Sequence, residues 1–309
     1  MIESLIACFQ ALLVVLLAPL FSGMARVMRA KLQSRQGPGL LQDYHDIGKL
    51  FKRPDISSNS SSYIFRLMPI VLLATMVLLA MCLPIITRFA PIPGLGDMIT
   101  IVYLLALSRF VFVLAALDSS SAFSGAGGIR ELVISTLIES AMLLSLMVVA
   151  LIAGSTDVGV IGAKIASGNV QSVIAVIVAG VAFAFTIYVE LGRLPFDLAE
   201  AEQELQEGPL TEYSGPSFAL VKLGLSVKQI VVISWFIALF LPFGSAAELA
   251  PAALIIGLVV FLLKLFVIFM VVSLIENSMT RVRFKLLSQQ TWIVVGVSAL
   301  ALIFYIVGL

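Results

Sequence analysis

Residues 252–275, AALIIGLVVFLLKLFVIFMVVSLI, decide the fold class of this chain, because this apolar run contains a single charged side chain, Lys264. In a helix with a rise of about 1.5 Å per residue, about 20 such residues cross the roughly 30 Å hydrocarbon layer of a bilayer. The rest of the chain has the same character, since 61% of the 309 residues are hydrophobic, 12% are charged, and the mean hydropathy is +1.12. A soluble domain has about a quarter charged residues. The sequence therefore predicts an integral membrane protein.

Eight apolar runs of this kind can be placed along the chain, so we expect an all-α, polytopic membrane protein in which residues 1–309 form one membrane domain. The expected spans are residues 3–25, 64–88, 98–117, 131–153, 172–191, 226–244, 252–275 and 291–309. The first run is preceded by Glu3 and by no basic residue, which predicts a retained helix and not a signal peptide. No internal repeat of the kind found in inverted-repeat transporters is evident.

The distribution of Lys and Arg predicts the orientation of the spans. Fifteen basic residues lie in the segments after spans one, three, five and seven or at the edge of span two, whereas Arg88 and Lys164 lie on the opposite side. Basic residues are concentrated in cytoplasmic loops. We therefore expect these segments to be cytoplasmic and both termini to be on the outer side.

The composition also excludes several functional classes. The formal net charge of +1 argues against a nucleic-acid binder. The two cysteines, Cys8 and Cys82, lie far apart in apolar runs, and His45 is the single histidine. These ligands are too few for an iron–sulfur cluster or a structural zinc site. We expect this chain to bind no cofactor of its own, so any redox centre belongs to a partner.

The first cytoplasmic loop, residues 26–62, begins with a basic segment, residues 26–53, that has a net charge of +5. After the turn at 37–39, Leu40, Tyr44, Ile47 and Phe51 form one helical stripe, which predicts an interfacial helix. Two interpretations remain open. The segment either sets topology by lying on anionic membrane lipid, or docks a soluble partner. The docking candidates are Arg26, Arg29 and Arg35.

The second cytoplasmic loop, residues 190–225, contains an acidic segment, residues 190–212, with the sequence ELGRLPFDLAEAEQELQEGPLTE and a net charge of −6. Pro195 ends the fifth span, Asp197 can cap a new helix, and Gly208 with Pro209 ends it. We therefore expect one short helix. The candidates for loop structure and docking are Asp197, Glu200, Glu204, Glu207 and Glu212.

A helical wheel divides this expected helix into two faces. Glu200, Glu204 and Glu207 share one face, which is predicted to be solvated, and the opposite face holds Leu198, Ala201 and Leu205. Glu202 falls beside Leu198 on the apolar face. A carboxylate in that position must be paired or protonated, unless the helix is exposed and Glu202 lies at its rim.

Three charged residues are predicted to lie within the bilayer. Arg109 and Glu139 are each about 12 Å deep from the same side, so they can form a pair, and Lys264 is about 16 Å deep. One interpretation is a proton path that runs from the acidic segment through Glu190 and Glu139 to Lys264. The proton-path candidates are thus Glu139, Glu190, Glu202, Lys264 and Arg109. The alternative is that the intramembrane charges only lock helices together.

The acidic segment also resembles a known family. The run Gly192-Arg193-Leu194-Pro195-Phe196-Asp197-Leu198-Ala199-Glu200-Ala201-Glu202-Gln203-Glu204-Leu205 is similar to the signature loop of the subunit 1 family of respiratory complex I. Residues 36–43, QGPGLLQD, resemble the first cytoplasmic loop of that family. Residues 202–215, EQELQEGPLTEYSG, with residues 42–53, QDYHDIGKLFKR, resemble its hydrogenase-linked branch, which serves hydrogenase-4 and formate hydrogenlyase complexes. One departure is Ser140, where these relatives are expected to have proline.

The resemblance implies a non-catalytic membrane subunit in the bacterial cytoplasmic membrane that anchors a hydrogenase and couples it to proton movement. The implied partners are soluble large and small [NiFe]-hydrogenase subunits, iron–sulfur subunits and antiporter-like membrane subunits, and the [NiFe] centre and iron–sulfur clusters belong to them. The residues leave two alternatives open: a quinone-reactive subunit like that of complex I, and an independent ion transporter.

Overall fold

The computed structural model describes residues 2–57, 61–92, 94–168, 170–281 and 284–308, without the side chains of residues 2, 202–203 and 284–288. The described residues are mostly helical, and they form no β-strand. The helices are α1 (Ile2–Leu32), α2 (Gln42–Leu50), α3 (Tyr63–Cys82), α4 (Met98–Asp118), α5 (Ala122–Ala153), α6 (Val158–Ala166), α7 (Val173–Glu190), α8 (Glu202–Leu205), the 3₁₀ turn η1 (Gly208–Leu210), α9 (Gly215–Phe240), α10 (Pro251–Ser278) and α11 (Phe284–Val307).

Eight of the described helices are long and apolar enough to cross a membrane, which confirms the number of spans predicted from sequence. They are α1, α3, α4, α5, α7, α9, α10 and α11. Three of them begin well before the predicted residue, α5 at Ala122, α9 at Gly215 and α11 at Phe284, because backbone hydrogen bonding continues past the apolar window. As a result Lys222, which falls in the expected loop 190–225, lies within α9 together with Lys228.

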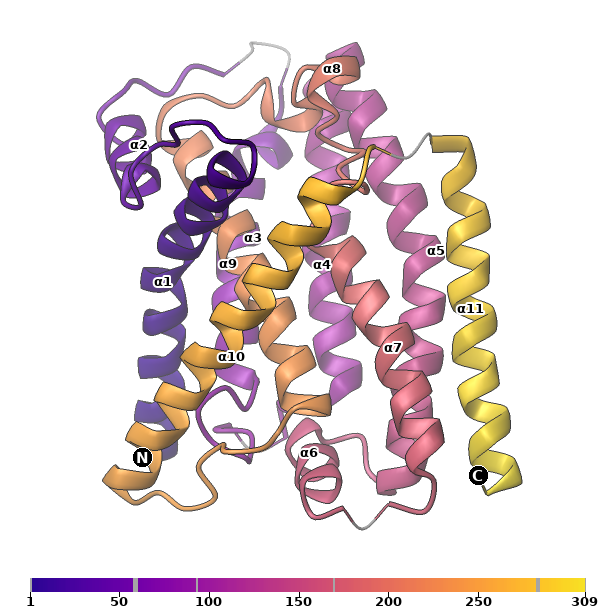
Figure 1. Ribbon diagram of the computed structural model, residues 1–309. Coiled ribbons are helices and arrows are strands. Elements are labelled where there is room, and N and C mark those ends of the chain that lie inside the picture. The colour runs from indigo at the N-terminus through magenta and orange to yellow at the C-terminus, as the bar shows by residue number, and fades with distance from the viewer. Residues whose placement is uncertain (1, 58–60, 93, 169, 282–283, 309) are drawn as a thin grey trace.

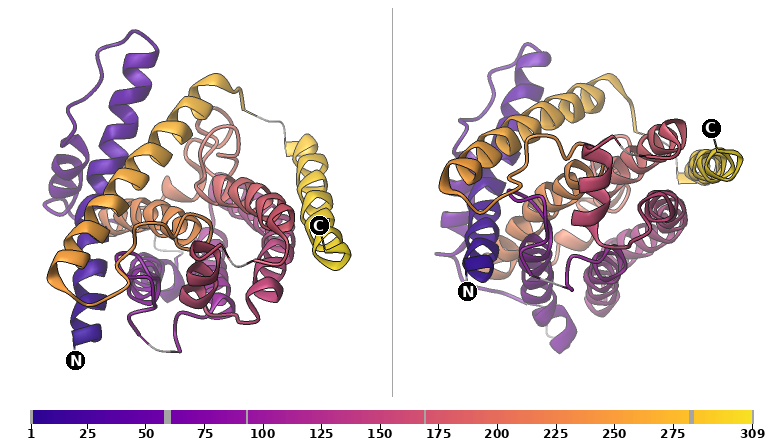
Figure 2. Two further views of the ribbon diagram at one scale, coloured as in Figure 1. Left: turned by 60° about the horizontal axis from the view of Figure 1, so that its bottom comes forward. Right: turned by 90° about the horizontal axis from the view of Figure 1, so that it is seen from below.

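The spanning helices stand side by side around α9, which packs against α1, α3 and α7 (Figures 1 and 2). On α9, the fully buried Trp235 meets the ring of Phe183 edge-to-face, with centroids 5.1 Å apart. Helix α10 runs obliquely across the outside of this group, and α11 packs on α5 and α7 at the opposite edge. The core therefore forms where α3, α4, α5, α7 and α9 meet.

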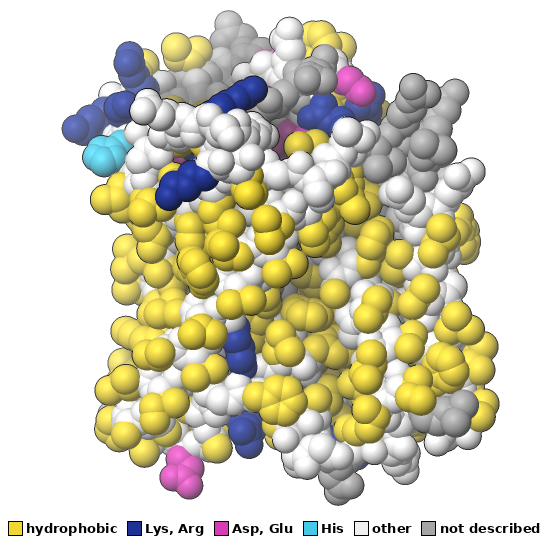
Figure 3. All heavy atoms as spheres, viewed as in Figure 1, with side chains coloured by type: hydrophobic (Ala, Val, Ile, Leu, Met, Phe, Trp, Pro, Cys, Tyr) yellow, Lys and Arg dark blue, Asp and Glu magenta, His cyan; other side chains and the backbone are white. Residues whose placement is uncertain are grey.

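The two ends of the bundle differ in charge. Helix α2 and the acidic segment lie at one end, called the charged end below, and both termini lie at the other (Figure 1). Hydrophobic side chains cover the sides of the molecule, whereas Lys and Arg gather at the charged end (Figure 3). Such a distribution is what the two water-facing ends and the lipid-facing belt of a membrane protein require.

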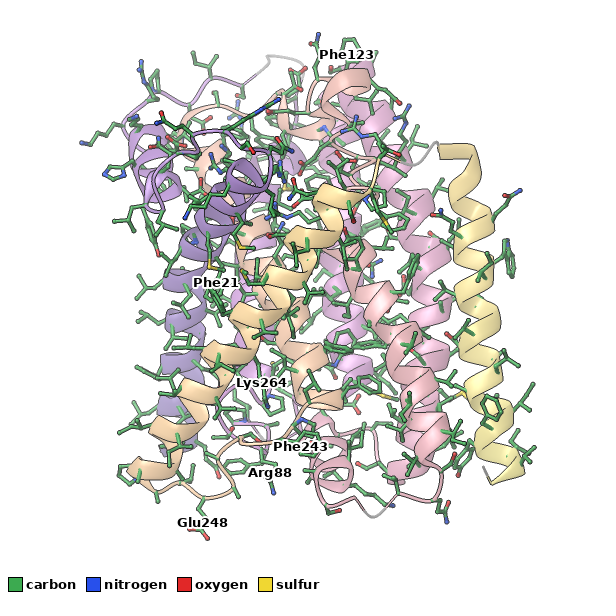
Figure 4. The ribbon with its side chains drawn as sticks, viewed as in Figure 1. Phe21, Arg88, Phe123, Phe243, Glu248 and Lys264 are labelled. Carbon is green, nitrogen blue, oxygen red and sulfur yellow. The ribbon has the colours of Figure 1, made fainter. Side chains whose placement is uncertain are left out.

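Two polar side chains satisfy helix carbonyls toward the end that carries the termini. Gln10 Nε2 on α1 donates to Ala80 O and Leu83 O, each at 2.8 Å, where α3 ends. Lys264 Nζ on α10 donates to Leu241 O at 2.5 Å and to Phe243 O, where α9 ends (Figure 4). Both contacts matter because carbonyls left unpaired in hydrocarbon are costly.

The acidic segment rests directly on the start of α5 at a glycine. A Cβ built on Gly127 would lie 2.7 Å from Ala199 O and 2.6 Å from Pro209 Cδ, so only glycine allows this approach. Gly208 makes the reciprocal contact from a backbone with φ of +53°. By contrast, a Cβ on Gly125 would meet nothing closer than 3.9 Å.

We predict that Gly127→Ala displaces the acidic segment, whereas Gly125→Ala does not. Alanine is favoured over glycine inside a helix by up to about 1 kcal/mol, so intrinsic propensity alone would make both changes stabilising. We expect a lower apparent Tm and faster proteolysis within residues 190–212 for Gly127→Ala only. Equal behaviour of the two variants would contradict the close contact.

Candidate functional site

A cavity of about 480 Å³ opens at the charged end, between the acidic segment and helices α1, α2, α4, α7 and α9. Charged side chains from these elements line it. Two more are those of Glu276, in the last turn of α10, and of Arg281, which follows that helix. Charged side chains cannot line a water-free cavity without pairing, so their contacts define the site.

Glu190, at the end of α7, lies at the bottom of this site and is 6% exposed. Arg109 Nη1 on α4 lies 3.2 Å from its Oε1, and Lys228 Nζ on α9 lies 3.2 Å from its Oε2. Arg109 Nη2 also lies 3.8 Å from Glu139 Oε2 on α5. These four residues, called the buried charge cluster below, carry two positive and two negative charges and join four spanning helices.

The predicted proximity of Arg109 and Glu139 is thus confirmed, but Arg109 is shared with Glu190. The Glu139 side chain is 30% exposed, unlike that of Glu190 at 4%, so part of it lies on the outer surface of the single chain. Ser140, expected as proline, sits within the uninterrupted helix α5, where its hydroxyl donates to Leu137 O at 2.8 Å.

A second buried carboxylate, Glu276, was missed by the sequence analysis because it directly follows the apolar run that ends at Ile275. It is 4% exposed, accepts a hydrogen bond from Arg29, and lies 3.8 Å from Arg193 Nη1. The sequence signal that could have identified it is a carboxylate directly after an apolar run, where the helix continues and can bury the side chain. These contacts tie α1, α10 and the acidic segment together.

Several docking candidates are engaged inside the molecule. Arg26 pairs with Asp43 of α2, Arg29 pairs with Glu276, and Asp197 receives two bonds from Arg281, one of them from Nε at 2.9 Å. Arg35 is exposed. The helix α2 forms where the apolar stripe predicted one, and its Tyr44 hydroxyl donates to Leu16 O of α1.

The prediction of one continuous helix in the acidic segment was wrong. Only Glu202–Leu205 is α-helical, because φ is positive at Ala201, Gln206, Glu207 and Gly208. The side chains of Leu198, Ala201 and Leu205 are nevertheless buried, as the wheel predicted. The side chain of Glu202 lies outside the described part of the structure, so its predicted difference from its neighbours stays a prediction.

The acidic side chains do not share one solvated face. Glu204 is exposed and pairs with Arg130 Nη1 at 2.6 Å, and Glu207 is exposed at the cavity rim, while Glu212 is half-buried. Glu200 instead turns into the cavity and is half-buried. The pKa of Glu200 is raised to about 7, chiefly by burial and also by the nearby carboxylates of Asp197, Glu131 and Glu207, against the opposing effect of Arg193. This carboxyl can therefore exchange a proton near neutral pH.

The structure brings Glu190, Glu139 and Arg109 together and adds Lys228, but it does not bring Lys264 to them. Lys264 instead lies beside Phe243, toward the opposite end of the bundle (Figure 4). Among the described residues there is no group of three His, Cys, Asp or Glu side chains that could hold a metal ion.

We predict that Glu190 and Lys228 are energetically coupled. Glu190→Gln leaves two buried cations without their shared carboxylate, and removing one member of a buried ion pair costs about 3 to 5 kcal/mol. We expect a strong loss of folded protein for Glu190→Gln alone and a smaller further loss when the background is Lys228→Met. The readout is the apparent Tm and the yield in detergent, and strictly additive losses would contradict the coupling.

We also predict that Glu200 makes stability depend on pH. Because its pKa is raised from 4.5 to about 7, the protonated carboxyl stabilises the fold fully below pH 4.5, and this contribution is lost as the pH rises through about 7. Glu200→Gln should therefore flatten the dependence of the apparent Tm on pH across this window. The exposed Glu204, changed to Gln, serves as the control and should leave the slope unchanged. A wild-type slope in Glu200→Gln would contradict the raised pKa.

Comparisons with known proteins agree with this architecture. A family model described as NADH dehydrogenase matches residues 4–307. Hydrogenase-4 component C of Escherichia coli is 50% identical over 98% of this chain and 96% of its own length. Formate hydrogenlyase subunit 4 of the same organism is 43% identical over 95% of this chain and 96% of its own.

More distant relatives share the same fold. A subunit of an NADH-quinone oxidoreductase of Cereibacter sphaeroides is 33% identical over 93% of this chain and 92% of its own length. A chain in the structure of the membrane-bound sulfane sulfur reductase, described as an archaeal respiratory membrane complex, superimposes with a TM-score of 0.83 at 20% identity, over 96% of this chain and 98% of that chain. The resemblance found in the sequence is confirmed, and the chain belongs to the NADH dehydrogenase family, the family of complex I subunit 1.

Proposed function

We propose that this chain is the membrane anchor and proton-coupling subunit of a formate hydrogenlyase or hydrogenase-4 type complex in the bacterial cytoplasmic membrane. It links a soluble [NiFe]-hydrogenase arm to antiporter-like membrane subunits, and it carries no catalytic centre. The [NiFe] centre and the iron–sulfur clusters lie in its partners. The observation that carries this proposal is the buried charge cluster, which joins the cavity at the charged end to Glu139 in the middle of α5.

The orientation of the chain supports docking of a soluble arm at the charged end. Fifteen basic residues predict that this end faces the cytoplasm. After the internal pairs are formed, Arg35, Lys49 and Lys52 of the basic segment remain exposed there, and so does Glu207 at the cavity rim. A surface with both signs of charge favours an oriented encounter with a complementary partner.

The arrangement of Arg109 supports a relay of charge into the membrane. Arg109 lies between two carboxylates, 3.2 Å from Glu190 and 3.8 Å from Glu139. A proton taken up by either carboxylate weakens its attraction for Arg109 and strengthens the contact to the other. Glu200, whose pKa is about 7, can deliver that proton from the cavity.

The exposed part of Glu139 supports an onward step to a partner. A carboxylate in contact with lipid at this depth is costly, so the surface around Glu139 is expected to be covered by another membrane subunit. The antiporter-like subunits are the partners that such a path requires. An independent transporter would work as a purified single chain in liposomes, whereas this proposal expects no ion flux there.

We predict that Glu139→Gln uncouples the complex without dismantling it. Glutamine keeps the shape of the side chain but cannot carry a proton, and the partial exposure of Glu139 makes its loss less damaging to folding than that of Glu190. Hydrogenase should stay on the membrane, while proton movement coupled to formate oxidation in inverted vesicles should fall at least several-fold.

The control for this experiment is Ser140→Ala, which changes the neighbouring exposed position on α5 without altering charge. It should preserve both membrane retention and proton movement. If Glu139→Gln kept full proton movement, the proposed path through the buried charge cluster would have to be abandoned.

A further inference from the structure

A second large cavity shares Leu191 and Phe196 with the charged cavity, but none of the four residues of the buried charge cluster lines it. It is an open groove of about 1000 Å³ between α7, α9, α10 and α11, on the side of the bundle where α11 packs against α5 and α7. Its walls are apolar, with Val181 and Phe185 on α7, Val271 on α10 and Ile293 on α11. A groove of this size in the membrane is filled by something apolar, because it offers water almost no hydrogen-bond partners.

The groove covers only one half of the membrane thickness. On α7 its lining runs from Val181 to Leu191, and on α10 from Ile268 to Ser278. Each of these stretches corresponds to a rise of about 15 Å, which is half of the roughly 30 Å hydrocarbon layer. Both stretches end at the charged end of their helices. A spanning helix needs the full thickness, whereas the acyl chains of a lipid occupy one leaflet.

Polar groups are confined to the end of the groove nearest the charged end. Ser278 and Thr280 lie there, and Gln290 Oε1 is buried without a hydrogen-bond partner among the residues that the structure describes. The unpaired acceptor on Gln290 favours a headgroup that carries a hydrogen-bond donor.

We propose that this groove holds one glycerophospholipid of the leaflet at the charged end. Its acyl chains fill the space between α10 and α11, and an ethanolamine or glycerol headgroup donates to Gln290. Pro195 and Phe196 also line the groove, so the lipid touches the beginning of the acidic segment. The lipid therefore packs α11 against α10 and supports the segment that closes the charged cavity. This inference is independent of the proposed proton path.

Two valines on α10 provide a matched test. Val271 lines the groove and Val267, one turn earlier, does not, yet they are 48% and 49% exposed. In the purified membrane complex, Val271→Trp should lose one tightly held phospholipid per complex after exhaustive washing with detergent, measured by mass spectrometry of extracted lipid. Val267→Trp should retain it. Gln290→Leu should retain the acyl chains but lose the preference for ethanolamine or glycerol headgroups over choline in lipid exchange.

A photocrosslinker separates the lipid from a protein occupant. With p-benzoylphenylalanine in place of Val271, illumination of the complex should add the mass of a phospholipid to this chain, and the same label at Val267 should give much less of this product. Capture of another polypeptide at Val271 would overturn the proposal in favour of a partner helix. Unchanged lipid content in an assembled Val271→Trp complex would overturn it as well.

Discussion

The fold of this chain depends on one constraint, which is that Glu190 is buried at the end of an apolar helix and must be neutralised there. Arg109 and Lys228 do so at 3.2 Å each, from two other helices. Because an unpaired charge at this depth costs several kcal/mol, α4, α7 and α9 are held at positions where all three groups meet. Arg109 also reaches Glu139 at 3.8 Å, so α5 is included in the same arrangement. Specificity of helix packing here comes from charge, since apolar contact alone discriminates poorly among lipid-facing helices.

At the charged end, further ion pairs hold other elements in place. Glu276 joins α1 and α10 to the acidic segment through Arg29 and Arg193, and Asp197 is held by Arg281. These pairs join α1 to α10, the acidic segment to α10, and the acidic segment to the residue stretch after α10, so they fix the walls of the cavity. Glu200 has no cation within ion-pair distance among the described pairs, and neither have Glu131 and Glu207, which line the same cavity. The pKa of Glu200 is raised chiefly by burial, so this carboxyl can exchange a proton near neutral pH without breaking an ion pair of the framework.

The sequence predicted the spans well because hydrocarbon thickness fixes the length of an apolar run. It predicted the depth of Arg109 and Glu139 for the same reason, since depth follows from counting residues. A hydropathy window, however, marks where lipid begins and not where a helix ends. The sequence therefore did not predict the buried ion pairs of Lys228 and Glu276, which lie at the edges of expected spans but are buried within the helices α9 and α10. It also failed in the acidic segment, where the contact between Gly127 and Ala199 O and the positive φ of Gly208 impose turns that helical periodicity does not contain. Lys264 lies within the candidate span α10, and its partners are backbone carbonyls that only the tertiary structure supplies.

Charge balance within the buried charge cluster limits how it can work. Its two positive and two negative groups are neutral together, so a single added proton leaves one excess positive charge in a low-dielectric environment. That excess must be removed quickly, either back to the cavity or onward past Glu139. Glu190 cannot reach the surface, since it is 6% exposed and held by two cations, whereas the Glu139 side chain is 30% exposed. On the proposed path, release onward is therefore favoured at Glu139, and a neighbouring subunit that covers this surface would determine whether the proton continues through the membrane or returns to the cavity.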